Sequence, residues 1–115
     1  MNIQIFGRAK CFDTKKAERF FKERGIKYQY IDLKQKGMSR GELESVIKAV
    51  GGLDKLIDDK SRSDNAALIK YLSSEEAKKE KLLEDAALIK TPVVRNGKKA
   101  AVGYSPEVWE SWTKE

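Results

Sequence analysis

The sequence predicts an α/β protein with a mixed sheet of about four strands flanked by helices. Three observations predict this class. Short apolar runs near both ends alternate as strands do, the segments beside them have the apolar spacing of helices, and a long helical stretch separates the two ends. The expected order is βαβ, a helical insert, then ββα. A strand, a helix and a strand in succession favour a right-handed crossover and a parallel pair.

The N-terminal part is expected to form the βαβ unit. Residues 2–6 alternate with isoleucines on one side, and residues 7–10 break that pattern as a loop. Residues 14–24 have helical spacing, and Gly25 stands where a left-handed residue ends a helix. Residues 27–33 are rich in tyrosine and isoleucine and are predicted to be the second strand.

A helical insert is expected from about residue 39 to residue 85. It opens with the capping-box sequence Ser39-Arg40-Gly41-Glu42, and the first helix of the insert ends at Gly51-Gly52. The remaining pieces are expected, in order, as helical at 53–57, polar at 58–64, and helical at 65–71 and 73–84.

The C-terminal part is expected to form a hairpin and a last helix. Residues 91–95 and 98–102 are apolar runs on either side of Asn96-Gly97, a pair that favours a type I′ turn. A serine and a proline at residues 105–106 open the last helix. With 115 residues and no linker, the chain is expected to be one domain over residues 1–115.

The composition excludes several kinds of function. The chain has no histidine and one cysteine, which excludes Ser-His-Asp and Cys-His catalysis, the usual zinc sites and an internal disulfide, so no metal site is expected. The apolar runs are too short to span a bilayer, and no membrane partner is expected. The first residues lack the pattern of an export signal, so we expect a cytoplasmic protein, and a monomer.

The net charge of +6 is concentrated in one segment. Residues 8–27 contain eight basic and three acidic residues, a net charge of +5, and this segment also contains the cysteine. One interpretation is a solvated helix face. Direct nucleic-acid binding is not expected, because the sequence has no RNP, zinc-finger or homeodomain signature. The charge is therefore expected to act locally, around the cysteine.

Cys11 lies between the first strand and the first helix. Unsatisfied N–H groups at a helix start favour an anion, and Arg8, Lys10 and Lys15 are close in the sequence, so the pKa of Cys11 is expected to lie below its ordinary value. Thr14 is placed to donate its hydroxyl to the sulfur. The alternative is an inert, buried thiol. Because there is no second cysteine, a redox cycle would need an external thiol such as glutathione, or another protein, and no bound cofactor is expected.

Residues 3–17, the second strand ending in Ile31-Asp32-Leu33, and the stretch from Thr91-Pro92 to residue 105 together resemble the ArsC/Spx family. This family contains glutaredoxin-coupled arsenate reductases, the Spx regulators and the YffB-like proteins. The resemblance extends over essentially the whole chain and implies a thioredoxin-like fold.

The resemblance to this family also implies that Pro92 is a cis-proline that faces Cys11 and presents the backbone of Thr91 to a peptide or glutathione. The alternative for Pro92 is an edge-strand proline in trans.

The sequence departs from the family pattern at several positions. The reductases have an arginine directly before the proline, where this chain has Thr91. A second family arginine falls in the polar stretch, where Lys60 or Arg62 could replace it, and a third falls near Ala101. Lysine lacks the planar fork of arginine, so these differences weigh against arsenate as a substrate. The Cys-x-x-Cys pair of Spx is also absent, since Thr14 stands at the second position.

Two hypotheses follow. In the first, the protein is a thiol-dependent oxidoreductase: Cys11 is the nucleophile, Thr91 aligns the substrate, and glutathione or glutaredoxin supplies the second thiol. The residues expected to attract an anionic ligand are Arg8, Lys10, Lys15, and Lys60 or Arg62. In the second, it is a non-enzymatic, Spx-like regulatory or adaptor protein whose basic first helix binds a protein such as RNA polymerase.

Overall fold

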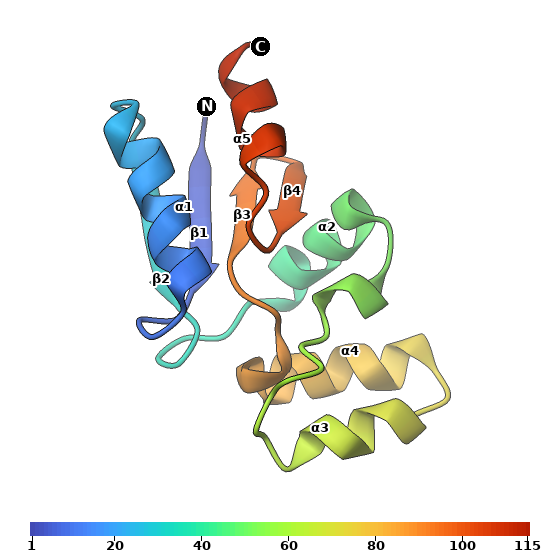
Figure 1. Ribbon diagram of the computed structural model, residues 1–115. Coiled ribbons are helices and arrows are strands. Elements are labelled where there is room, and N and C mark those ends of the chain that lie inside the picture. The colour runs from blue at the N-terminus through green and yellow to red at the C-terminus, as the bar shows by residue number, and fades with distance from the viewer.

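The computed structural model describes residues 1–115 and contains one four-stranded sheet of order β2-β1-β3-β4 (Figure 1). β1 (Ile3–Gly7) pairs in parallel with β2 (Tyr28–Asp32), and β3 (Val93–Asn96) pairs antiparallel with both β1 and β4 (Lys99–Val102). The expected α/β class and mixed four-stranded sheet are confirmed. β1 lies between a parallel and an antiparallel neighbour. Its carboxyl end therefore lies between the carboxyl end of β2 and the start of β3.

Helices cover both faces of this sheet. α1 (Phe12–Glu23) and α5 (Pro106–Thr113) pack on one face, and α2 (Arg40–Val50) packs on the other. α2 has the predicted capping box: the Ser39 hydroxyl accepts from the Glu42 backbone N–H at 3.1 Å, and the Glu42 carboxylate accepts from the Ser39 backbone N–H. These caps satisfy N–H groups that a helix start leaves free.

The two faces hold separate apolar cores, because successive side chains of a strand point to opposite faces. The core under α1 and α5 contains Ile3, Ile5, Ala17, Phe21, Val94, Ala101, Trp109 and Trp112. The core under α2 and the insert contains Phe6, Leu33, Met38, Leu43, Val46, Leu53, Leu56, Ile69, Leu82, Leu88, Ile89 and Val93. β1 and β3 contribute side chains to both cores, so they join the two layers.

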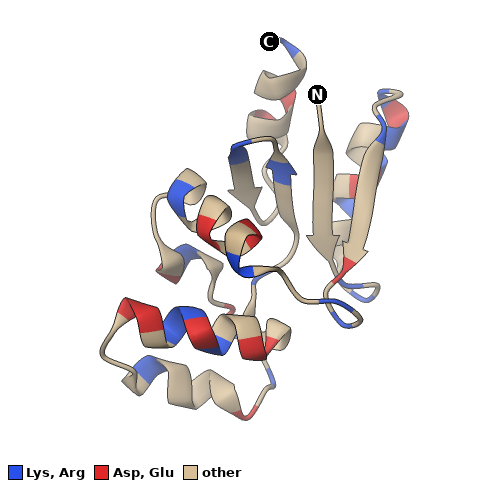
Figure 2. Cartoon of the chain, turned by 180° about the vertical axis from the view of Figure 1, so that it is seen from behind, with Lys and Arg blue, Asp and Glu red and all other residues tan.

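The insert between β2 and β3 is helical, as expected. After α2 its elements are η1 (Leu53–Leu56), α3 (Asn65–Leu68), η2 (Ile69–Tyr71), α4 (Glu75–Glu84) and η3 (Ala86–Leu88), where η marks a 3₁₀ helix. Residues 65–71, predicted as one helical piece, change from α to 3₁₀ geometry at Ile69. α3 and α4 form the end of the molecule opposite the two termini (Figure 1), and α4 has acidic and basic residues along its length (Figure 2).

The C-terminal hairpin is confirmed, but the predicted turn type is wrong. Asn96 and Lys99 pair with each other, so the two-residue loop is Gly97-Lys98. Gly97 has φ +62°, whereas no residue other than glycine has a positive φ. A positive φ at the first loop position alone is the pattern of a type II′ turn; type I′ needs it at both positions.

None of the helices is both long enough and apolar enough to cross a membrane. No group of three or more Cys, Asp or Glu side chains is arranged to hold a metal ion.

Candidate functional site: the junction of β1 and α1

Cys11 is the N-cap residue of α1. Its backbone is extended (φ −88°, ψ 117°), its N–H donates to the Arg8 carbonyl at 3.0 Å, and its own carbonyl accepts from the Lys15 N–H at 3.2 Å. The helix was expected to begin at Thr14, where the apolar pattern starts. It begins at Phe12, because the bond from the Lys15 N–H to the Cys11 carbonyl already has helical spacing. The thiol is partly exposed. It is therefore at the helix start, as predicted, and it is not part of either core.

Thr14 is the buried hydroxyl of the site. Its side chain is 1% exposed, and its Oγ1 accepts from the Arg8 backbone N–H at 3.4 Å. Gly7, the last residue of β1, makes room for it: a Cβ on Gly7 would lie 2.3 Å from Thr14 Cγ2 and 2.6 Å from Thr14 Oγ1. Real Cβ atoms do not approach other atoms so closely, so Thr14 can occupy this position only if residue 7 is glycine.

The Thr91-Pro92 peptide bond is cis and lies against Cys11. The cis form that the family resemblance implied is therefore confirmed, and the trans alternative is wrong. Pro92 is buried, and the Cys11 thiol donates to the Thr91 carbonyl with 3.7 Å between sulfur and oxygen. This places the loop before β3 directly opposite the start of α1.

Arg8 joins the two sides of the site. Its Nη1 donates to Thr91 Oγ1 at 3.4 Å, and its Nη2 donates to the Ala86 carbonyl at 2.5 Å. Arg8 thus donates to both threonine hydroxyls, through its backbone N–H to Thr14 and through its guanidinium to Thr91. Because each threonine hydroxyl accepts from Arg8 through its oxygen, its single proton remains free to be donated to Cys11.

The pKa of the Cys11 thiol lies below its ordinary value. Burial raises it, but hydrogen bonds from the side chains of Thr14 and Thr91, and from the backbone N–H groups of Thr14 and Asp13, lower it by more. Hydrogen bonds that favour the charged form of a group stabilise the thiolate. Basic neighbours were expected to contribute to the lowered pKa, but in the structure the hydrogen bonds that lower it come from hydroxyls and backbone amides.

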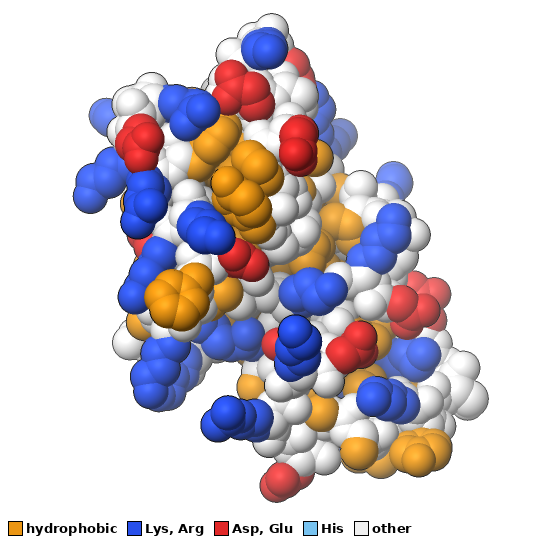
Figure 3. Space-filling view, in the orientation of Figure 1, with side chains coloured by type: hydrophobic (Ala, Val, Ile, Leu, Met, Phe, Trp, Pro, Cys, Tyr) orange, Lys and Arg blue, Asp and Glu red, His pale blue; other side chains and the backbone are white.

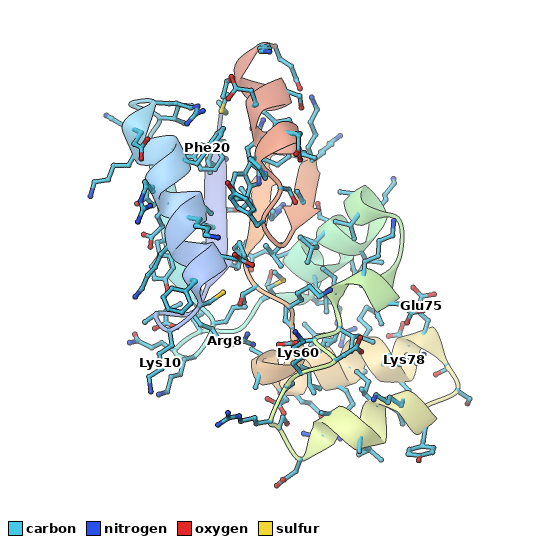
Figure 4. The ribbon with its side chains drawn as sticks, in the orientation of Figure 1. Arg8, Lys10, Phe20, Lys60, Glu75 and Lys78 are labelled. Carbon is cyan, nitrogen blue, oxygen red and sulfur yellow. The ribbon has the colours of Figure 1, made fainter.

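The expected cationic residues other than Arg8 form no hydrogen bond with the thiol or with its hydrogen-bond partners. Lys10, Lys15, Lys60 and Arg62 are exposed, and none forms a hydrogen bond or ion pair through its side chain. In the view of Figure 4, Lys10 and Lys60 lie to either side of Arg8. Lys15 extends over the ring of Phe12, 5.8 Å from its centroid. Lys10 and Lys15 lie within four residues of Cys11 in the chain, whereas no hydrogen bond or ion pair joins Lys60 or Arg62 to the site.

Two features of the site were not predicted. Phe12 directly follows the cysteine and is 78% exposed, which leaves an aromatic ring beside the thiol. A cavity of about 360 Å³ lies beside the loop between β1 and α1, where Asp32 at the end of β2 and the following Leu33 and Lys34 contribute to its lining. The available signal was topological, because the carboxyl ends of parallel strands meet at one edge and commonly form a binding crevice there.

Comparison with known proteins agrees with this architecture. Residues 6–112 match the model of the ArsC family. The chain belongs to the ArsC family. It is also 30% identical over 109 residues to global transcriptional regulator Spx 2 of Oceanobacillus iheyensis, and this match covers 90% of the chain and 78% of the relative. Both the family resemblance and the thioredoxin-like fold expected from the sequence are confirmed.

Solved structures show the same fold. An ArsC family related protein from Bacteroides fragilis superimposes with a TM-score of 0.85 at 22% identity, covering 96% of this chain and 97% of that one. An arsenate reductase from Vibrio cholerae superimposes with a TM-score of 0.84 at 21% identity, with the same coverage of each chain. At these identities the superpositions establish the ArsC-type fold and not the reaction.

Proposed function

We propose that this ArsC-family protein is a thiol-dependent oxidoreductase in which Cys11 is the nucleophile. The observation that carries the proposal is the state of the thiol: it is partly exposed at a helix start, opposite a cis-proline, with its pKa lowered by two threonine hydroxyls. The thiolate is the reactive form of cysteine, so a lowered pKa raises the reactive fraction at neutral pH.

The cycle requires two thiols, of which the chain supplies one. The Cys11 thiolate attacks a disulfide R–S–S–R, forms the mixed disulfide Cys11–S–S–R and releases R–S⁻. A glutathione thiolate then attacks the mixed disulfide and regenerates the Cys11 thiolate, with glutathione bonded to R. A second glutathione thiolate attacks that product and releases the second R–S⁻ and glutathione disulfide, so two glutathione thiols together pass two electrons to the original disulfide. The external thiol is needed because the chain has no second cysteine.

The residues around Cys11 take distinct roles in this proposal. Thr14 stabilises the thiolate, and the backbone of Thr91, held by Pro92, aligns the incoming sulfur. Arg8 orients both hydroxyls. The exposed cations Lys10, Lys15, Lys60 and Arg62 attract an anionic thiol compound such as glutathione.

A disulfide is a better candidate substrate than arsenate. The position before the cis-proline is Thr91 and not an arginine, and Ala101, where another family arginine was expected, is 7% exposed and belongs to a core. Lys60 and Arg62 stand on a loop with no bond to the thiol site. This chain lacks the convergent arginine forks that hold an oxyanion.

The experiment is a glutathione-dependent turnover assay. Purified protein is given a small glutathione mixed disulfide, glutathione, NADPH and glutathione reductase, and NADPH consumption is followed; arsenate replaces the disulfide in a parallel reaction. We expect turnover with the disulfide that Cys11→Ser abolishes and that the matched surface change Ser73→Ala leaves intact. Absence of turnover above the Cys11→Ser background with every substrate contradicts the proposal.

A second candidate function is a regulatory or adaptor role, which the 30% identity to a transcriptional regulator supports. The exposed Phe12 and the basic surface of α1 give an apolar and cationic contact for a protein such as RNA polymerase. The test is binding of purified RNA polymerase to the immobilised protein, to Phe12→Ser and to Cys11→Ser. Loss of binding in Phe12→Ser with retention in Cys11→Ser favours the adaptor; no binding by the parent protein excludes this partner.

A further inference from the structure

We propose that the cavity behind the loop of Cys11 binds a small molecule with two anionic groups, and that its occupant slows the reactions of Cys11 by contacting Arg8. The cavity has a volume of about 360 Å³, within the range of small-molecule sites. This site goes beyond the proposed oxidoreductase, since neither substrate disulfide nor glutathione is assigned to it.

Three segments form the cavity. The loop after β1 and the residues at the end of β2 face each other across it, and η3 closes one side; together they contribute Arg8, Ala9, Lys10, Asp32, Leu33, Lys34 and Ala87. Figure 2 shows the two loops next to each other below the carboxyl ends of β1 and β2, both with basic residues. In Figure 3 the surface is hollowed on this side, between the sheet and the insert, with basic side chains around it.

The charge of the lining favours an anion. Arg8, Lys10 and Lys34 are cationic, and Asp32 is the one acidic residue among them. The Asp32 carboxylate accepts from the Lys34 backbone N–H at 2.9 Å and forms no ion pair with a lysine. The ammonium groups of Lys10 and Lys34 have no hydrogen-bond or ion-pair partner in the protein. Two free cations on facing segments, with an arginine beside them, match a ligand that has two acidic groups.

The apolar part of the lining limits the size of the ligand. Leu33, Ala9 and Ala87 contribute methyl groups, and Leu33 is 3% exposed, so the cavity has a fixed wall there. A compact dicarboxylate or diphosphate has two anionic groups and is small enough for this cavity. The shared chemistry is two anionic groups on a small frame.

Arg8 couples this cavity to the thiol. The same guanidinium that lines the cavity donates to Thr91 Oγ1 at 3.4 Å, and Thr91 in turn bonds to Cys11. An anion that draws the guanidinium toward itself weakens this long contact. The Thr91 hydroxyl then loses the hydrogen bond that orients its proton toward Cys11. The anion also adds negative charge near the sulfur. Both effects disfavour the thiolate, so the occupied protein reacts more slowly.

The test measures binding and Cys11 reactivity with citrate and with pyrophosphate as the probes, at constant ionic strength set with NaCl. Calorimetry gives the affinity, and alkylation by neutral iodoacetamide gives the reactivity. Lys34→Ala removes one cation of the cavity, and Lys36→Ala is the matched control, an exposed lysine two residues away that does not line it.

We expect saturable binding of at least one probe, weakened about fivefold in Lys34→Ala and unchanged in Lys36→Ala, with an alkylation rate that falls with the same midpoint. Preference for citrate indicates a carboxylate ligand, and preference for pyrophosphate a phosphate ligand. Binding that is absent, or equally affected in both variants, overturns the site; binding without a change in alkylation overturns the coupling. Neither readout requires oxidoreductase activity, so this proposal and the proposed function can fail separately.

Discussion

At the residue scale, two threonine hydroxyls determine the state of the cysteine. Thr14 is buried beneath the sulfur, Thr91 lies across from it, and each accepts a hydrogen bond from Arg8. The positive charges that the sequence places nearby are exposed and screened by solvent. The pKa of Cys11 therefore depends on local donors more than on the net charge of the segment.

Thr14→Val tests this account, because it removes the hydroxyl and keeps the shape. We expect iodoacetamide to alkylate Cys11 about tenfold more slowly at neutral pH, since a hydrogen bond to a charged group is worth about 1.5 kcal/mol. Thr14→Ser restores the donor and should recover most of the rate. A Thr14→Val protein that reacts as fast as the parent shows that Thr14 has no part in lowering the pKa.

Gly7→Ala tests the packing that positions Thr14. The added Cβ would meet Thr14 Cγ2 at 2.3 Å, so the threonine must move and both stability and alkylation rate should fall. We expect a loss of about 1–3 kcal/mol in the free energy of unfolding. Gly41→Ala is the control: its Cβ has nothing within 4 Å, and alanine in the first turn of α2 should stabilise the protein by about 0.5–1 kcal/mol. Urea denaturation distinguishes the two.

At the element scale, one carboxylate ties the loop before α3 to the end of α4. Asp85 accepts from the Ser63 hydroxyl, from Asn65 Nδ2 at 3.1 Å and from the Ala87 backbone N–H at 3.1 Å. The bond from Ser63 is the main cause that lowers the pKa of Asp85, burial opposes it, and Asn65 and Ala87 add to the lowering. This carboxylate caps η3, whose Ala86 carbonyl holds Arg8.

The lowered pKa of Asp85 predicts how stability depends on pH. Its contribution is fully present above the ordinary aspartate pKa of about 3.9 and is lost as the pH falls through the lower folded pKa. Asp85→Asn should therefore cost about 1 kcal/mol at pH 7 and progressively less in acid. Asp64→Asn, at an exposed carboxylate with no hydrogen bond, is the control. Equal effects of the two substitutions at pH 7 would refute this role for Asp85.

At the scale of the whole molecule, a single sheet joins two cores. Phe6 of β1 packs with α2 and the insert, whereas Ile5 of the same strand packs with α1 and α5. Both tryptophans, Trp109 and Trp112, belong to the core under α1 and α5. Tryptophan fluorescence thus reports on one core, and far-UV circular dichroism reports on the helices over both.

Leu43→Ala tests whether the cores unfold together. Leu43 is fully buried in the core under α2 and the insert, and its truncation should cost about 2–5 kcal/mol. Because β1 and β3 are shared, we expect the urea midpoint measured by fluorescence to shift as far as the midpoint measured by circular dichroism. A fluorescence midpoint that stays at the parent value would mean that the cores unfold independently.

The sequence predicts those parts of the fold and site that depend on local pattern. Alternation identified the strands, the capping box identified the start of α2, and the position of Cys11 between a strand and a helix was visible directly. The turn type failed because the strand pairing of Asn96 with Lys99 decides which residues form the loop. The role of Gly7 depends on how closely the start of α1 packs on the end of β1, and the cavity beside Lys34 brings together residues distant in sequence. Local patterns contain no information on either contact.

The most direct test of the central claim is the pH dependence of mixed-disulfide formation between Cys11 and glutathione disulfide, followed by intact mass. We predict one glutathione adduct, absent in Cys11→Ser, that forms at a rate with a midpoint pH below the ordinary cysteine pKa of about 8.5. Absence of the adduct, or a midpoint at or above that value, would contradict the account of Cys11 as a reactive thiolate.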